Sequence, residues 1–154
     1  MNRFHIHIST TAQLLTLFEL PHDLDDVGLR WAVPTPGKVI MQVAISSSKN
    51  GVGQQKGSYQ TPQGRHVIRA KIGTGAAFNT VFVGRRKTGE IWSAELAEKF
   101  PGRDWILTRF LWLCGLEPGK NRFGECDTMG RYIYLHGSPD TVKMCEPGSI
   151  GCIR

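Results

Sequence analysis

The chain has 154 residues, of which 40% are hydrophobic and 21% are charged, a composition that excludes a disordered protein. Its best candidate for a membrane span, Trp105 to Leu116, is interrupted by Thr108 and Arg109 and is shorter than the ~18 apolar residues that a spanning helix needs. The net charge of +6 comes from scattered Lys and Arg residues without a nucleic-acid-binding motif, so we expect no nucleic-acid partner and no membrane span.

Hydrophobic residues mostly recur at every second position, which is the period of a β-strand. We expect strands at residues 4–8, 15–17, 39–45, 67–72, 80–83, 106–112 and 132–135. Gly and Pro residues mark turns at 34–37, 50–51, 61–64, 73–75, 118–119 and 147–148. One helix is expected at 93–100, capped by Ser93 and ended by Pro101. This pattern predicts a mainly β, sandwich or barrel-like fold, and without repeats or linkers it predicts a single domain over residues 1–154.

The amino terminus does not resemble a secretory signal. Residues 1–8 alternate polar and apolar side chains, whereas a signal has a charged start, an apolar block and a small-residue cleavage site. The sequence alone therefore predicts a cytoplasmic protein, or a mature or incomplete form.

The cysteines and histidines do not predict a metal site. There is no Cys-x-x-Cys spacing, so structural zinc is not expected. His5 and His7 share one face of an expected strand, but no third ligand lies nearby, and a solvent-facing strand is the preferred interpretation. A disulfide between two of Cys114, Cys126 and Cys145 stays open, because sequence alone cannot pair them.

Two segments near the end of the sequence carry the residue types of a thiol acyl-transfer site. His136 ends an expected strand, on the same face as Tyr134, and can act as a base. Cys152 follows Gly151, and the backbone amides of these two residues could stabilise an oxyanion. Arg154 could hold negative charge and favour the thiolate. Considered alone, this Cys and His also fit a buried cysteine and a hydrogen-bonded histidine without a catalytic role.

The complete pattern is more specific: His136-Gly137 is followed by Ser149-x-Gly151-Cys152-x-Arg154. This pattern resembles the signature of the L,D-transpeptidase catalytic domain, a family of cysteine enzymes that cross-link bacterial peptidoglycan. Upstream, residues 57–64 resemble the family's Thr-Pro-x-Gly turn, and residues 127–137 resemble the approach to its catalytic histidine. The resemblance spans residues 4–154, nearly the whole chain.

The resemblance implies a role for each site residue. Cys152 is the implied nucleophile and His136 its base and later acid. Ser149 and the carbonyl of Gly137 are the implied groups that orient the imidazole, and Arg154 is the arginine beside the oxyanion site.

The resemblance also implies a reaction. The cysteine attacks the third residue of a peptidoglycan tetrapeptide stem and releases the terminal D-alanine. The thioester then passes to an amine of a second stem, typically of diaminopimelate, which forms a 3–3 cross-link, or it passes to water. No cofactor is implied, and carbapenems acylate the cysteine in many members. The implied location is the cell envelope or periplasm, where such enzymes serve cell-wall biogenesis and cell shape.

Three residues have a secondary assignment to the substrate groove: Thr61, Pro62 and Tyr134. The first two belong to a Thr-Pro-x-Gly run that is first of all a turn. Asp127 and Arg131 are expected to form a pair that fixes a loop.

Family members continue past the arginine into a short helix and a closing strand, whereas this sequence ends at Arg154. We therefore expect a truncated C-terminal end, a missing last strand and an unpaired sheet edge beside Cys152. Three functions stay open: an active L,D-transpeptidase, an L,D-carboxypeptidase or wall-trimming thiol hydrolase, and an inactive murein-binding module.

Overall fold

The computed structural model describes residues 3–21 and 37–154, so most of the turn expected at 34–37 lies outside the described residues. Over these residues, eight strands form two antiparallel sheets, and neither sheet closes into a barrel. The predicted mainly β fold is confirmed. The chain divides into two compact units, Met1–Ile45 and Ser46–Arg154, so the single domain stays a prediction. No helix in the described part is long and apolar enough to cross a membrane.

The first unit contains a three-stranded sheet of β1 (Arg3–Ser9), β2 (Leu14–Leu20) and β3 (Lys38–Ala44), in that order. All three strands were expected from the alternation of apolar residues. β1 and β2 pair in continuous register from Arg3 opposite Leu20 to Ser9 opposite Leu14. His5 packs its ring against Phe18 of β2, with the ring centroids 6.4 Å apart. This contact gives His5 a packing role within the sheet.

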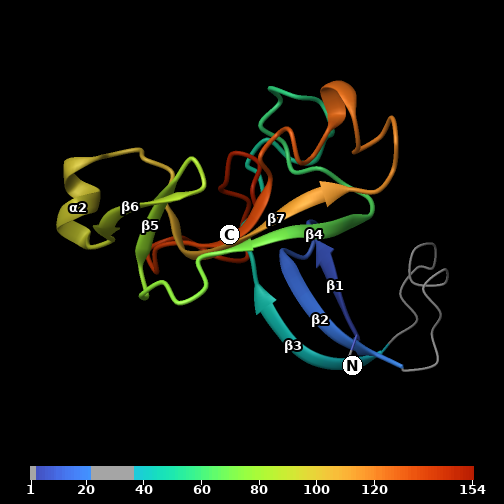
Figure 1. Ribbon diagram of the computed structural model, residues 1–154, viewed down its shortest axis with the longest axis horizontal. Coiled ribbons are helices and arrows are strands. Elements are labelled where there is room, and N and C mark those ends of the chain that lie inside the picture. The colour runs from blue at the N-terminus through green and yellow to red at the C-terminus, as the bar shows by residue number, and fades with distance from the viewer. Residues whose placement is uncertain (1–2, 22–36) are drawn as a thin grey trace. The chain divides into compact units, whose positions relative to one another are not determined.

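The second unit is built around β7 (Ile106–Gly115), which lies beside β4 (His66–Ile72) in Figure 1. β7 also pairs with β5 (Thr80–Val83) and β8 (Tyr134–Gly137), and β5 pairs with β6 (Arg86–Ile91). Because Leu107 pairs with both β5 and β8, and Phe110 pairs with both β4 and β8, β8 must occupy the edge of β7 opposite to β4 and β5. The histidine strand is therefore held directly against the centre of the sheet.

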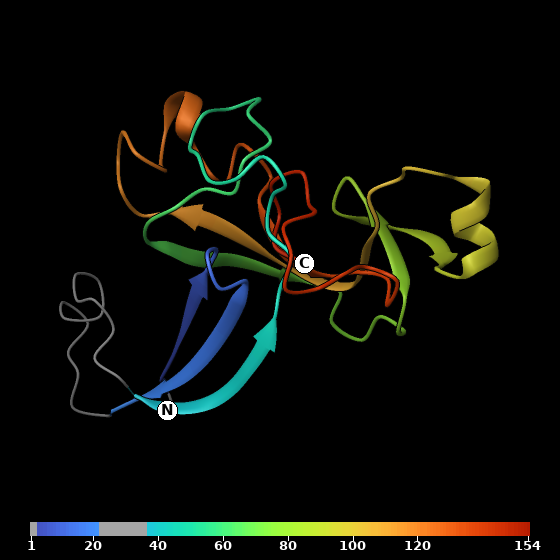
Figure 2. The same cartoon turned by 180° about the vertical axis from the view of Figure 1, so that it is seen from behind.

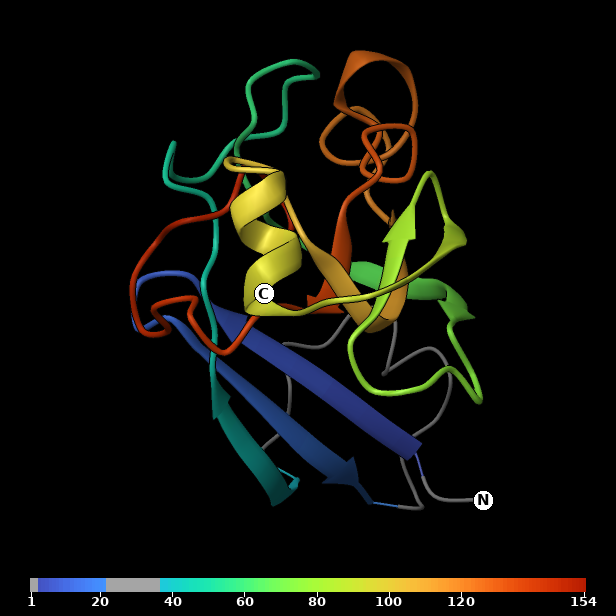
Figure 3. The same cartoon turned by 90° about the vertical axis from the view of Figure 1, so that its left-hand side faces the viewer.

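The centre of the sheet in the second unit is buried on both faces. Val81 belongs to a cluster with Trp105 and Leu107, whereas Phe82 packs with Phe110 and other residues. Since successive residues of a strand point to opposite faces, the two clusters lie on opposite sides of the sheet. The first cluster is covered by α2 (Ala94–Lys99), which Figure 3 shows from its outer side. The second cluster contains Ala76 and Tyr134 and is partly covered by Cys152, so the candidate nucleophile lies on the face opposite to α2.

The predicted helix is confirmed, and its cap follows the sequence signal. The side chain of Ser93 accepts a hydrogen bond from the backbone N–H of Leu96 at 3.2 Å. β6 was not predicted, because its residues, Arg-Lys-Thr-Gly-Glu-Ile, are mostly charged or polar and largely exposed. The strand forms because residues 84–85 close a two-residue hairpin after β5, pairing Val83 with Arg86.

Two long loops lie side by side at one end of the second unit, one formed by residues 46–64 and the other by residues 116–131 (Figure 2). The second includes the short 3-10 helix η1 (Gly124–Cys126). Arg131 joins the loops by donating to the carbonyls of Gly53 at 3.0 Å, Gln54 at 2.9 Å and Gln60 at 2.6 Å. Asp127 accepts from backbone N–H groups of its own loop. Each residue thus fixes backbone, but the two side chains do not form the expected pair.

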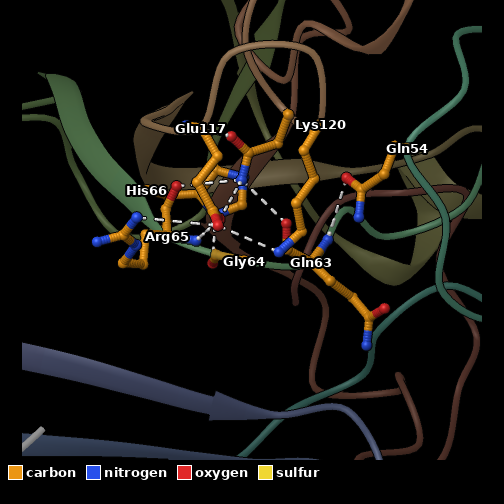
Figure 4. Close-up of polar contacts among 8 residues, drawn as sticks. Gln54, Gln63, Gly64, Arg65, His66, Glu117 and Lys120 are labelled. Carbon is orange, nitrogen blue, oxygen red and sulfur yellow. Dashed lines mark hydrogen bonds and ion pairs between the residues drawn. The ribbon is translucent and has the colours of Figure 1, made fainter. Parts of the chain in front are cut away.

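A second polar cluster, around Glu117, fixes the segment that leads into β4 (Figure 4). The carboxylate of Glu117 accepts from the backbone N–H of Arg65 at 2.7 Å and pairs with Lys120 at 3.2 Å. His66 bridges the carbonyl of Gly64 and the hydroxyl of Thr128, at 3.0 and 2.9 Å. These contacts hold the end of the Thr-Pro-x-Gly segment against the 116–131 loop.

The outer edge of β8 is occupied by the end of the chain. His136 donates its backbone N–H to the carbonyl of Ile153 at 3.0 Å, and Ile153 donates to that of Tyr134 at 2.9 Å. Arg154 and Ser46 then exchange two backbone hydrogen bonds of 3.0 and 3.1 Å. The expectation of an unpaired sheet edge beside Cys152 is therefore wrong, because Ile153 pairs in parallel with Leu135 of β8.

Candidate active site

The thiol of Cys152 lies between two backbone groups at the start of β8. The backbone N–H of Tyr134 donates to Sγ at 3.4 Å, and the thiol is 3.5 Å from the carbonyl of Tyr132, to which it donates. Burial raises the pKa of Cys152 to about 12, while the Tyr134 N–H and the cations Arg154 and Arg131 act in the opposite direction. At neutral pH the resting group is therefore a protonated thiol.

His136 is buried, with 8% of its surface exposed, and only one of its ring nitrogens has a partner. Nδ1 lies 2.8 Å from the carbonyl of Gly137. A carbonyl only accepts, so Nδ1 carries the proton and Nε2 carries the lone pair. Nε2 has no hydrogen-bond partner among the described residues. Burial holds the pKa of His136 below its usual range, so the ring is neutral and able to accept a proton at pH 7.

Gly137 fits its position because β8 approaches β7 closely there. A Cβ at residue 137 would lie 2.6 Å from the backbone carbonyl oxygen of Leu107, too close for any side chain. The glycine thus lets the strand bring its own carbonyl to the imidazole. Of the two groups expected to orient His136, the Gly137 carbonyl is the one in contact with the ring.

The other expected group, Ser149, lies instead inside the turn that carries the cysteine. Its hydroxyl, 1% exposed, donates to the carbonyl of Cys152 at 2.5 Å and accepts from the N–H of Gly151 at 3.2 Å. Gly151 has φ +131, a left-handed conformation that favours glycine. Because the Gly151 N–H is used by Ser149, the Cys152 N–H is the amide of this pair that has no partner in the described chain.

Thr61 ties the Thr-Pro-x-Gly segment to the same turn. Its hydroxyl is buried and donates to the carbonyl of Gly151 at 3.0 Å, while it accepts from the backbone N–H of Ser48 at 2.9 Å. Pro62 is also buried. The side chain of Thr61 therefore contacts Gly151, the residue before the candidate nucleophile. Its hydroxyl is bonded to protein groups on both sides and is not exposed in a groove.

Arg154 is held by a carboxylate that the sequence analysis did not single out. Its guanidinium forms an ion pair of 2.5 Å with Asp104 and donates to the carbonyl of Gly148 at 3.2 Å. The negative charge of Asp104 acts to raise the pKa of both His136 and Cys152, and the positive charge of Arg154 acts to lower both. Asp104 lies between α2 and β7, 32 residues before His136, and no local motif marks it.

The model of the YkuD family, the L,D-transpeptidase catalytic domain, matches residues 3–154. The chain belongs to this family. We found no match to it among curated proteins or among solved structures. The family model supports the resemblance drawn from the Ser149–Arg154 motif and a function connected with peptidoglycan.

The L,D-transpeptidase domain places His136 and Cys152 on neighbouring backbone segments, through the backbone pairing of β8 with Ile153. Their side chains are not hydrogen-bonded to each other, since Sγ contacts backbone atoms and Nε2 has no partner within residues 3–21 and 37–154. The resting site thus holds a neutral acid and a neutral base.

The remaining cysteines of the domain are free thiols: Cys114, Cys126 and Cys145. The disulfide that the sequence left open is not formed in the structure. Among the described residues, no group of three or more His, Cys, Asp or Glu side chains could hold a metal ion.

Proposed function

We propose that the protein is a cysteine-dependent L,D-transpeptidase that acts on peptidoglycan stem peptides. The observation that carries the proposal is the buried, neutral His136, whose Nε2 lone pair has no partner in the described chain, in the same region as the Cys152 thiol. A buried nitrogen without a hydrogen-bond partner costs free energy. Accepting the proton of the Cys152 thiol during the reaction would remove that cost, and this suits His136 to the role of general base.

In the proposed reaction, proton transfer and bond formation occur together. The Cys152 thiol leaves the Tyr132 carbonyl and gives its proton to Nε2 of His136, while Sγ bonds to the carbonyl carbon of the donor's third residue. The tetrahedral intermediate collapses, the C–N bond to the terminal D-alanine breaks, and His136 returns the proton to the leaving amine. A second stem amine then attacks the thioester, and the cysteine leaves as a thiol. This order suits a group with a pKa of about 12, because no thiolate has to exist before substrate binds.

The amide N–H of Cys152 is the proposed oxyanion donor, because the N–H of Gly151 already donates to Ser149. Arg154 contributes through its positive charge, which lowers the pKa of Cys152. Ser149 and Thr61 act by fixing the turn on which these groups lie. The Gly137 carbonyl fixes the tautomer of His136. We expect the protein to work in the cell envelope, where its substrate is located.

The proposal is tested with a disaccharide-tetrapeptide donor, with and without an acceptor amine. We expect release of D-alanine and a cross-linked dimer, and we expect Cys152→Ala to abolish both. Cys145→Ala is the matched control, because Cys145 is an exposed free thiol and its loss should leave the rate unchanged.

Other outcomes assign the protein to the alternative functions. Hydrolysed donor alone, even with acceptor present, supports a carboxypeptidase or thiol hydrolase. Unchanged donor, together with no carbapenem adduct on Cys152 by intact mass, supports an inactive murein-binding module and overturns the proposal, provided the protein is folded.

A further inference from the structure

Arg85 lies over two aromatic rings, and one of them belongs to Tyr132, whose backbone carbonyl accepts from the Cys152 thiol. Its guanidinium carbon is 4.7 Å from the ring centroid of Tyr132 and 5.3 Å from that of Trp112. These two rings stack on each other, with centroids 6.0 Å apart, and Trp112 meets Tyr134 edge-on at 6.1 Å. The backbone atoms of the two tyrosines are the ones that contact Sγ of Cys152. The cation is therefore linked to the nucleophile through the same two residues.

The backbone around Arg85 is held in an unfavourable conformation. Arg85 forms the tip of the β5–β6 hairpin with Gly84, and both residues have positive φ, +68° and +53°. Two-residue hairpins of this kind favour Asn or Gly, and an Arg in the left-handed region is uncommon. Tyr132, the ring beneath the guanidinium, also has a positive φ of +58°. Arg85 and Tyr132 are two of the eight non-glycine residues with positive φ in the described part of the chain, and their side chains contact each other.

The charge of Arg85 is available to a ligand. The residue is exposed, and none of the carboxylates among the described residues forms an ion pair with it. The neighbouring tyrosine hydroxyls, Tyr134 foremost, raise the pKa of its guanidinium, so it is fully charged. Hydrogen bonds to the side chains of Tyr134 and Tyr132 use part of the donor capacity of Arg85. A guanidinium carries five N–H donors, so others remain to meet a planar carboxylate while the two rings support the group from one side.

We propose that Arg85, on its platform of Tyr132 and Trp112, binds a carboxylate of the acyl donor and so determines donor specificity. The proposal rests on the proposed function. Two carboxylates of a tetrapeptide stem flank the scissile bond: that of the terminal D-alanine and that on the side chain of the third residue. Both present the same planar anion to the guanidinium, and the experiment separates them.

The test compares three donors: the free-acid tetrapeptide, the same peptide amidated at its C-terminus, and the same peptide amidated on the third side chain. Arg85→Asn removes the cation and suits the hairpin tip better than arginine, so misfolding of the turn does not explain a loss. Arg86→Asn, at the exposed next position, is the matched control. We expect Arg85→Asn to raise KM for the free-acid donor by about 10-fold to 100-fold, the size of one lost charge-assisted hydrogen-bonding site. Arg86→Asn should stay within about twofold, and Arg85→Lys should recover part of the loss.

The two amidated donors identify the carboxylate that Arg85 binds. When that carboxylate is the amidated one, wild type and Arg85→Asn should have the same KM. With the other amidated donor, Arg85→Asn should still have the higher KM. An unchanged KM for the free-acid donor overturns the proposal, and so does an equal loss with all three donors.

A binding measurement keeps the test independent of turnover. Calorimetric titration of the free-acid tetrapeptide into Cys152→Ala protein should show binding that weakens about 10-fold or more when Arg85→Asn is added. If wild type turns over no donor but this difference appears, the proposed function fails and the carboxylate site stands. If the peptide binds equally to both proteins, or to neither, the carboxylate site fails.

Discussion

Replacing Thr61 by Val tests how the cysteine turn is held. The substitution keeps the shape of the side chain but removes its hydroxyl. That hydroxyl joins three parts of the site, because it accepts from the N–H of Ser48, donates to the carbonyl of Gly151 and belongs to the Thr-Pro-x-Gly segment. Thr61 is 1% exposed, and both hydrogen bonds are buried, so water cannot replace the missing partner.

The expected cost follows from the two groups left behind. Each buried backbone group that loses its only partner costs about 1 to 3 kcal/mol. The carbonyl of Gly151 and the N–H of Ser48 both lose the Thr61 hydroxyl, and packing of the added methyl does not offset this. We therefore expect Thr61→Val to lower the free energy of unfolding by about 2 to 6 kcal/mol, the lower value applying if the loop relaxes around the site.

Urea unfolding followed by circular dichroism measures this change, and acylation of Cys152 by a carbapenem, followed by intact mass, reports the state of the turn. Thr61→Ser is the control, because it keeps the hydroxyl and loses one methyl, with an expected cost of about 1 kcal/mol. Acylation should slow in Thr61→Val and change little in Thr61→Ser. A Thr61→Val protein within about 0.5 kcal/mol of wild type, or a Thr61→Ser protein as unstable as Thr61→Val, would refute the reasoning.

Three further predictions concern the charges of the site. Burial raises the pKa of Cys152 to about 12. Peptide-resolved iodoacetamide labelling of Cys152 at pH 7.5 should therefore be on the order of 10³-fold slower in folded protein than in urea. The labelling rate of the folded protein should still increase with pH at pH 10, and a plateau below pH 9 contradicts this. Asp104 acts to raise that pKa, so Asp104→Asn should move the labelling profile to lower pH, whereas Asp140→Asn at an exposed position should not. The pKa of His136 is lowered in the folded state, so the unfolded chain takes up the proton first as pH falls below about 6.5, and stability is lost. Urea unfolding at pH 7 and 5 should therefore show a smaller loss of stability in His136→Asn than in wild type. An equal loss in the two proteins would argue against a buried neutral ring.

The elements that the sequence predicted are those in which the local pattern and the tertiary contacts agree. Residues 4–8 alternate apolar and polar side chains, as a strand requires, and they lie in β1; Ser93 with Pro101 marks the ends of α2. β8 begins at Tyr134 and not at 132, because Tyr132 adopts a positive φ that no alternation of side chains indicates. β6 was not predicted, because its side chains are largely solvated and show no alternation of apolar residues. Its pairing with β5 depends on the hairpin at residues 84–85.

The sequence by itself determined the chemistry that is available. The spacing from His136 to Arg154 is an identifying motif, and each residue type in it has a fixed repertoire of proton transfer, nucleophilic attack or charge. Contacts between distant segments were decided only by the tertiary structure. Asp104 reaches Arg154, Thr61 reaches Gly151 across 90 positions, and Arg85 lies over Tyr132. The same is true of the electrostatics, because the high pKa of Cys152 and the low pKa of His136 arise chiefly from burial. Burial depends on which faces of a sheet are covered, and the order of residues along one segment does not specify that.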